Sequence, residues 1–213
     1  MIVKVYGMRH GEKETGPNQD LVGLSKEGKR QVCASVINNL MGIEFDALYC
    51  SQKFRALQTV VEAVSVLPKR NNNMGVETRL GFDYTGAPDL DKFGKFTAEV
   101  KSRSEQEKRP ITIGLWREVA PKTVDFLSNR VWQEIYQIAK TYHSTRKNEV
   151  NMFVGSHSPT IELASNDLNM PILKEADIVL YTVVVSEDIT GMKIRQISTT
   201  YISRGDISVH PVG

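Results

Sequence analysis

Short apolar stretches that suit buried strands alternate with amphipathic stretches that suit helices near the start of the chain. Residues 2–8 alternate apolar and polar side chains, and residues 45–50 form a second apolar stretch. Apolar residues with helical spacing follow each stretch, behind Ser25 as a cap in the first case and behind Ser51 in the second, and Pro68 ends the second helix. Strands that alternate with helices in this way are typical of an α/β fold with a mostly parallel sheet.

The alternation returns in the second half of the chain. Apolar residues of the segment 123–146 share one face of a long helix, and residues 150–155 form a further apolar strand. Ser158 then stands at the cap position of a helix whose first residue is a proline. Two more strands, 177–185 and 192–202, form a closing hairpin. The pattern predicts a three-layer α/β/α sandwich with a mixed, mostly parallel central sheet.

The segment 81–121 interrupts this regular pattern. It contains glycines, prolines and a mixed-charge run over residues 101–109. A chain of 213 residues suits one hydrophobic core, so we expect a single domain over residues 1–213 in which 81–121 is an inserted, lid-like excursion.

Composition excludes several classes of protein. Lys and Arg total 27 and Asp and Glu total 25, and the net charge of +2 is too small for a surface built to neutralise nucleic acid. The longest apolar run, 178–185, is far too short to cross a bilayer. The first residues lack the pattern of a secretory signal, so a cytoplasmic protein is expected. Cys33 and Cys50 show no CxxC spacing, and we expect reduced thiols, no metal site and no cofactor.

Polar side chains directly follow three of the predicted strands. Arg9 and His10 follow the first strand, residues 51–55 follow the second, and His157 follows a later one. Ligands of open α/β sheets bind at the carboxyl ends of the strands, so we expect these residues in one site. The guanidiniums of Arg9 and Arg55 with two imidazoles form a cationic pocket that suits a phosphoryl group. His10 is the expected nucleophile, because no cysteine, activated serine or metal cluster accompanies it.

Four motifs in this order indicate a family. They are Arg9-His10-Gly11-Glu12, Leu24-Ser25-x-x-Gly28-x-x-Gln31, Ser51-x-x-x-Arg55-Ala56-x-Gln58-Thr59 and Val154-Gly155-Ser156-His157. Together they resemble the motifs of the phosphoglycerate mutase-like histidine phosphatase superfamily. The resemblance implies that His10 accepts the phosphoryl group. It implies that Arg9, Arg55 and His157 hold the phosphoryl oxygens. We add Ser158, the residue after the second histidine, to the expected phosphate-binding residues.

Two carboxylic acids are candidates for the proton donor. The superfamily commonly takes its donor from the loop after the second helix, where this sequence has Asp83 in place of the usual glutamate. Glu12 either shapes the pocket or donates the proton, and the two roles stay equal at this point. Two other departures bear on the substrate class: Ser158 replaces the usual glycine, and Glu162 stands where the mutases often have an arginine.

The motifs predict a metal-independent phosphatase that hydrolyses phosphomonoesters through a phosphohistidine on His10. The expected partner is a small phosphorylated substrate, with a phosphoprotein as the alternative. Three other functions remain open: a phosphoglycerate-type phosphomutase, a protein phosphohistidine phosphatase and a non-catalytic protein that binds a phospho-ligand. The length of 81–121 argues against the smallest phosphohistidine phosphatases, and the presence of His10 and both arginines argues against a non-catalytic protein. The sequence carries no signal for an oligomeric state.

Overall fold

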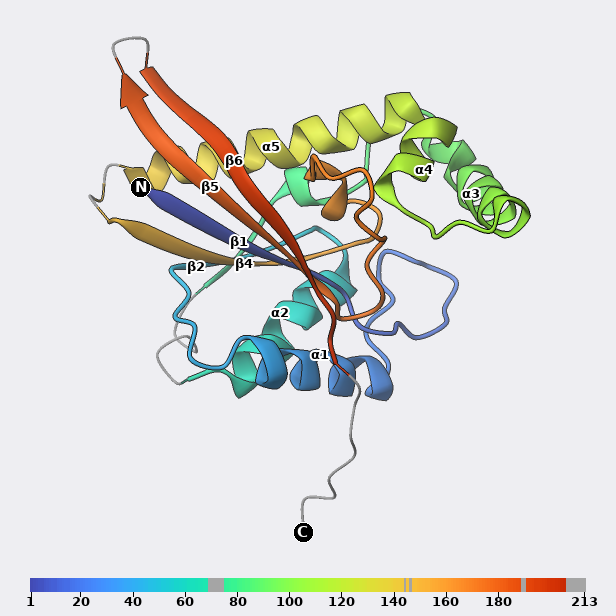
Figure 1. Cartoon of the computed structure of the whole chain (residues 1–213). Coiled ribbons are helices and arrows are strands. Elements are labelled where there is room, and N and C mark those ends of the chain that lie inside the picture. Colours follow the sequence, from blue (N-terminus) through green and yellow to red (C-terminus); the bar gives the residue numbers. More distant parts are fainter. Residues whose placement is uncertain (69–74, 144, 146, 189–190, 206–213) are drawn as a thin grey trace.

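A six-stranded sheet in the order β3-β2-β4-β1-β5-β6 forms the middle of the described part of the molecule (Figure 1). The computed structural model describes residues 1–68, 75–143, 145, 147–188 and 191–205. The strands are β1 Ile2–Arg9, β2 Ala47–Cys50, β3 Val76–Thr78, β4 Glu149–Ser156, β5 Ile178–Asp188 and β6 Gly191–Ile202. The α-helices are α1 Lys26–Asn39, α2 Phe54–Val66, α3 Phe93–Glu107, α4 Ile113–Val119 and α5 Pro121–His143. Short 3₁₀ helices are η2 Leu80–Phe82, η3 Leu90–Lys92 and η4 Glu162–Ala164.

The sheet is mixed and mostly parallel, as the sequence predicts. Neighbouring strands β3, β2, β4 and β1 are parallel. Strand β5 is antiparallel to β1, and β6 is antiparallel to β5. The carboxyl ends of β1, β2 and β4 therefore lie at one edge of the sheet, where the polar motifs follow them.

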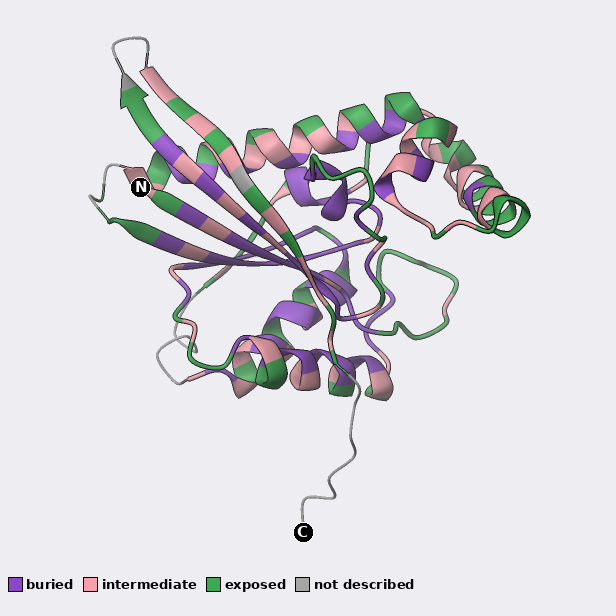
Figure 2. Cartoon of the chain, viewed as in Figure 1, coloured by how far each residue is buried: buried purple, intermediate pink, exposed green. Residues whose placement is uncertain are grey.

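Helices cover both faces of the sheet and form two cores with it. Helices α1 and α2 lie on one face, and α5 lies on the other (Figure 1). The alternation along β1 decides which side chain joins which core, because successive side chains of a strand point to opposite faces. Val3 and Val5 pack in the core of α5, whereas Tyr6 and Met8 pack in the core of α1 and α2. Buried residues run along the central strands between the two layers (Figure 2).

The predicted start of α1 is confirmed, but that of α2 is wrong. Ser25 caps α1, and its hydroxyl accepts a hydrogen bond from the backbone N–H of Gly28 at 3.0 Å. Helix α2 begins after Lys53 with no side-chain cap, because the hydroxyl of Ser51 is bonded to His157 instead. The buried face of α2 also differs from the one that its apolar residues predict, because Leu57 and Val61 are exposed. The buried residues of α2 are Arg55, Ala56, Thr59, Val60 and Ala63.

The helix predicted to begin at Ser158 is also wrong. Residues 158–160 form turns and residue 161 a bend, and the only helical part that follows directly is η4. The Ser158 hydroxyl donates a hydrogen bond to the carboxylate of Glu162 rather than capping a backbone N–H. The preference of serine for the helix cap position is therefore not realised here, because its hydroxyl binds a buried carboxyl group instead.

The segment 81–121 contains structure that periodicity did not predict. It holds η3, α3 and α4, and α4 packs against both α3 and the start of α5 (Figure 1). Helix α3 buries only Val100, which explains why no apolar stripe marks it in the sequence. Strand β3 was missed because it has three residues and none of them is buried.

The described residues contain no helix that is long and apolar enough to cross a membrane. Within the same part of the chain, no three His, Cys, Asp or Glu side chains are grouped so that they could hold a metal ion. Cys33 and Cys50 are both free thiols.

Candidate active site

His10 lies directly after β1, at the edge of the sheet where the polar motifs meet. Its backbone N–H donates to the carbonyl of Ser156 at the end of β4, at 3.0 Å. Two motif glycines let the loop around His10 pack on the first turn of α1. A Cβ at Gly11 would lie 2.2 Å from the carbonyl oxygen of Gly28, and a Cβ at Gly28 would lie 1.9 Å from that of Glu12. Only glycine permits this close approach of two backbones, which holds the histidine in place.

The ring of His10 is set up as a neutral nucleophile. Its Nδ1 lies 2.7 Å from the carbonyl oxygen of Gly11, which can only accept, so Nδ1 carries the proton and Nε2 carries the lone pair. Burial lowers the pKa of His10 to about 3. The charges of Arg55 and Arg9 act in the same direction, and the hydrogen bond to Gly11 opposes them. The imidazole is therefore uncharged at neutral pH.

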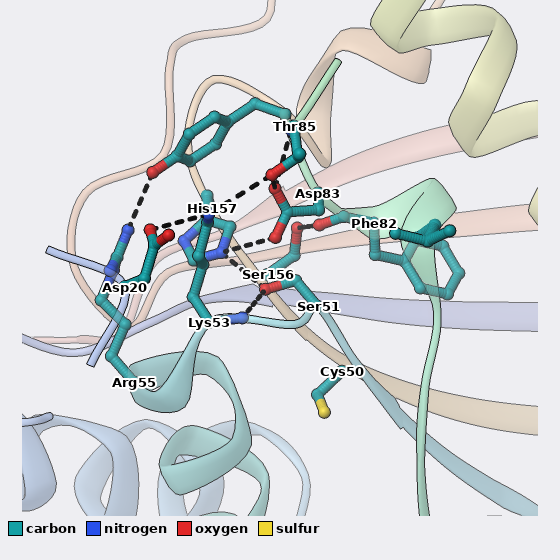
Figure 3. A network of polar contacts seen from close by, with 12 residues as sticks. Asp20, Cys50, Ser51, Lys53, Arg55, Phe82, Asp83, Thr85, Ser156 and His157 are labelled. Carbon is teal, nitrogen blue, oxygen red and sulfur yellow. Dashed lines mark hydrogen bonds and ion pairs between the residues drawn. The ribbon is translucent and has the colours of Figure 1, made fainter. Parts of the chain in front are cut away.

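His157 faces His10 from the end of β4. The two ring centroids are 5.3 Å apart, and His157 is 1% exposed. Its Nε2 lies 2.6 Å from the hydroxyl of Ser51, which follows β2 (Figure 3). Burial lowers the pKa of His157 well below its usual value, and the neighbouring side chains of His10 and Arg55 act in the same direction. Its Nδ1 is buried and has no partner among the described residues.

Asp83 is a buried carboxyl group beside His157. Its Oδ1 accepts two hydrogen bonds from Thr85, one from the backbone N–H at 2.8 Å and one from the hydroxyl at 2.7 Å (Figure 3). Its Oδ2 lies 4.0 Å from Nε2 of His157 and makes no hydrogen bond within the described structure. One oxygen is thus fixed by the protein, and the other is free to meet a ligand.

The two arginines of the motifs have different surroundings. Arg55 is 4% exposed, and it donates to the carbonyl of Gln19 at 2.6 Å and to the hydroxyl of Tyr84 at 3.2 Å. Arg9 instead donates to the carbonyl of Leu173 at 2.6 Å and to the carboxylate of Glu175 at 2.8 Å. The Nε atom of each arginine is buried and lacks a partner in the part of the chain described. Arg9 therefore lies at the border of the site, toward the segment before β5.

Glu12 and Ser158 have partners away from the two histidines. Glu12 is exposed, and its carboxylate accepts from the hydroxyl of Ser25 at 2.7 Å, at the cap of α1. The hydroxyl of Ser158 donates to the carboxylate of Glu162, and burial raises the pKa of Glu162 to about 7. The structure thus brings His10, His157, Arg55 and Asp83 together but leaves the carboxylate of Glu12 outside this group.

Three residues of the site were missed or misread from the sequence. Ser51 was interpreted as a helix cap but is the partner of His157. Tyr84 packs its ring against His157, with centroids 5.3 Å apart, and no motif of the sequence marked it as part of the site. Lys53 was not singled out, although it is 8% exposed and its Nζ lies 2.8 Å from Asp20. Its place between Ser51 and Arg55, inside a motif, was the one signal that could have drawn attention to it.

A cavity of about 520 Å³ adjoins the site. Its walls are mostly apolar or aromatic and include three basic residues. The residues that line it are Arg9, Phe93, Thr97, Val100, Lys101, Ile111, Trp116, Ser158, Pro159, Pro171, Ile172 and Lys174. Phe93 stacks on Tyr84, with centroids 5.9 Å apart, so α3 connects the cavity to the residues around His157. Half of the lining residues come from the segment 81–121.

The sequence matches no protein-family model and no curated protein. Solved structures are nevertheless similar over almost the whole chain. Mycobacterial glucosyl-3-phosphoglycerate phosphatase, in complex with inorganic phosphate, aligns with a TM-score of 0.60 at 13% identity and covers 94% of this chain and 98% of its own. Phosphoserine phosphatase from Entamoeba histolytica, in complex with 3-phosphoglyceric acid, gives 0.52 at 18% identity, with 94% and 97% covered. The protein histidine phosphatase SixA, complexed with tungstate, gives 0.50 at 16% identity, with the same coverage. The fold of this chain is therefore the one that its motifs predict, that of the phosphoglycerate mutase-like histidine phosphatases.

Proposed function

We propose that this protein is a metal-independent phosphatase that hydrolyses phosphomonoesters through a phosphohistidine on His10. The observation that carries the proposal is the state of the His10 ring. Its Nδ1 proton is used by the carbonyl of Gly11, its pKa is lowered to about 3, and its Nε2 is left as an uncharged nucleophile. An imidazole in this state attacks phosphorus without first losing a proton.

In the first step, Nε2 of His10 forms a bond to phosphorus, and the bond from phosphorus to the leaving oxygen breaks. The leaving alkoxide takes a proton from Oδ2 of Asp83, the oxygen that has no partner among the described residues. In the second step, a water oxygen attacks phosphorus and gives a proton back to Asp83. The N–P bond then breaks, and its electron pair returns to Nε2 of His10.

Three residues hold the phosphoryl oxygens in this proposal. Arg55 is buried beside the histidines, and its planar guanidinium offers several donors in fixed directions. The second residue is His157, whose Nε2 lies 2.6 Å from the hydroxyl of Ser51. That hydroxyl also accepts a hydrogen bond from the backbone N–H of Lys53 at 3.3 Å. We assign the Ser51 hydroxyl as the donor to Nε2 of His157. The ring proton of His157 is then on Nδ1 and can be donated to a phosphoryl oxygen. Arg9 adds charge from the border of the site.

The leaving group occupies the cavity of about 520 Å³. This volume falls within the usual range for small-molecule sites, and its apolar walls favour a small organic leaving group over an extended protein surface. The similarity of fold to phosphatases of small phosphorylated metabolites supports the same choice.

The test is phosphate release from a panel of sugar, nucleotide, glycerate and phosphoprotein substrates in EDTA, combined with labelling by a radioactive phosphoryl donor. Wild-type protein should release phosphate and carry an acid-labile label, and His10→Ala should lose both. His143→Ala is the matched control, because His143 lies at the end of α5 beside Glu187 and away from the site. Turnover that needs a divalent ion, or an acid-stable label, would overturn the mechanism. Transfer of the label to an added product instead of water would identify a mutase.

A further inference from the structure

Lys53 and the first two residues of α2 direct three hydrogen-bond donors at two adjacent residues of the loop between β1 and α1. The ammonium of Lys53 lies 2.8 Å from Oδ1 of Asp20. The backbone N–H of Phe54 donates to the carbonyl of Asp20 at 3.2 Å, and the guanidinium of Arg55 donates to the carbonyl of Gln19 at 2.6 Å. A carboxylate and two carbonyl oxygens thus occupy a site that is built from two cations and the first backbone N–H group of a helix.

The two partners of the Lys53 ion pair are buried to very different extents. The side chain of Lys53 is 10% exposed, whereas that of Asp20 is 63% exposed. Lys53 is held by groups of the site itself: Nζ donates to the hydroxyl of Thr85 at 3.3 Å and lies 5.2 Å from the centroid of the Tyr84 ring. The ammonium is therefore a fixed part of the wall, and its anionic partner comes from a surface loop.

Lys53 is also connected to the residues of the proposed reaction. The Thr85 hydroxyl that accepts from Lys53 donates to Asp83, so two hydrogen bonds join the ammonium to the proposed proton donor (Figure 3). Its charge contributes to the lowered pKa of His157. Burial acts to lower the pKa of Lys53 itself, but the bond to Asp20 acts in the opposite direction and the pKa is raised overall, so the residue stays charged.

Other atoms in the same place lack a partner. Nε of Arg55 and Nδ1 of His157 are buried and make no hydrogen bond to any described residue. An unpaired buried donor costs free energy, so a ligand oxygen that accepts from Nε of Arg55 or Nδ1 of His157 would be stabilised here. The site therefore contains hydrogen-bond donors without an acceptor, next to an ammonium whose anionic partner, Asp20, belongs to a surface loop.

We propose that Lys53 is an anion-binding residue of this site, and that the carboxylate of Asp20 occupies the place of a ligand's anionic group until the ligand binds. A phosphate or carboxylate oxygen at this place takes over the ion pair, so Lys53 is never left buried without a counter-charge. Asp20 is then a competitor supplied by the protein itself. The inference rests on the proposed function for its place in catalysis, but anion binding tests it without turnover.

The experiment measures the dissociation constant of inorganic phosphate by calorimetry in EDTA for three variants. Lys53→Met removes the charge at nearly constant volume and should weaken binding about tenfold or more, because a charge-assisted hydrogen bond is lost. Asp20→Asn removes the competing charge and should tighten binding severalfold. Lys29→Met is the matched control and should change nothing, since Lys29 lies on α1 in a partly exposed pair with Glu62.

The opposite signs of the two effects decide the question. If Lys53 and Asp20 only clamp the loop, both variants lose the same contact, and both should weaken phosphate binding. That result, or unchanged binding in Lys53→Met, overturns the inference. Thermal unfolding of each variant checks the fold, and Lys53→Arg, which keeps the charge, should bind phosphate nearly as wild type does. If Lys53→Met does not fold, Asp20→Asn decides alone, and unchanged or weaker binding refutes the proposal.

The two proposals fail in distinguishable ways. Opposite shifts in phosphate binding without hydrolysis of any phosphomonoester would retain Lys53 as an anion-binding residue and refute the phosphatase. Normal turnover with both variants weakened would retain the phosphatase and refute the role of Lys53. For an active enzyme, Asp20→Asn should lower KM severalfold and leave kcat within about twofold, because it acts on binding.

Discussion

Replacing Asp83 by asparagine tests the proton donor with little change of shape. Asp83 is fully buried, and its Oδ1 accepts two hydrogen bonds from Thr85, which an amide oxygen accepts equally well. Its Oδ2 has no partner among the described residues, so the substitution alters mainly the atom that is proposed to carry the proton. We therefore expect Asp83→Asn to fold and to act on the rate of the first chemical step.

The size of the effect should depend on the leaving group. A positioned general acid contributes about 10²- to 10⁴-fold to a rate, which corresponds to about 3–5 kcal/mol of transition-state stabilisation. An alkyl phosphate such as glycerol phosphate needs this proton and should lose that factor in Asp83→Asn. A nitrophenolate leaves without a proton, so p-nitrophenyl phosphate should lose less than about threefold.

Single-turnover formation of the phosphoenzyme is the appropriate assay, because it excludes the hydrolysis step. Asp89→Asn is the control, since Asp89 lies on the same segment but is paired with Lys92 at the surface. Equal, small losses on both substrates would refute Asp83 as the acid and would direct attention to Glu12 or to a site without an acid. Equal, large losses would mean that Asp83 holds the pocket together and does not donate a proton.

Three further predictions concern the arginine, the buried glutamate and the cavity. Arg55→Lys should lower kcat/KM about 10- to 100-fold although the charge is kept, because an ammonium cannot replace the planar donors, while Arg30→Lys on the exposed face of α1 should have no effect; near-normal kinetics in Arg55→Lys would remove it from the site. Burial raises the pKa of Glu162 from 4.5 to about 7, so between these pH values Glu162 stays protonated in the folded protein but ionises in the unfolded chain, and the free energy of unfolding should fall by up to about 3 kcal/mol as the pH rises from 4.5 to 7. Denaturant unfolding should show a smaller fall in Glu162→Gln, and the same pH dependence of the unfolding free energy in the variant and the wild type would contradict the prediction. Ile172→Ala should raise KM for 1-naphthyl phosphate about 5- to 10-fold and leave glycerol phosphate unchanged, because Ile172 lines the cavity; equal effects would show that the leaving group lies elsewhere.

Local patterns predicted most of the fold, because each regular element buries one face and shows it in its spacing. The alternation along β1 and the stripe of α5 are both present in the structure, as are the cap of α1 and the closing hairpin. Patterns failed where burial is slight or where a different side-chain contact takes the place of a helix cap. Helix α3 buries a single residue, and Ser158 bonds to Glu162 instead of starting a helix.

The sequence by itself determined the order of the elements and the place of each polar motif after its strand. Since the carboxyl ends of parallel strands share one edge of a sheet, this order was enough to predict that His10, Arg55 and His157 lie together. Their roles in catalysis stay predictions, as does the lid-like role of the segment 81–121. The sequence also contains the glycines of the first two motifs, but the close backbone approach that they permit is seen only in the folded structure.

The tertiary structure alone decided which side chains become partners. Ser51 and His157 are 106 residues apart, and no local preference makes a serine before a helix bond to a distant histidine. The same holds for the turn of Arg9 toward Glu175 and for the ion pair of Lys53 with Asp20. Hydrophobic periodicity reports which face of an element is buried, whereas a hydrogen bond depends on the relative position of two elements to within a fraction of an ångström. That position is a property of the whole packed core, which no short stretch of sequence contains.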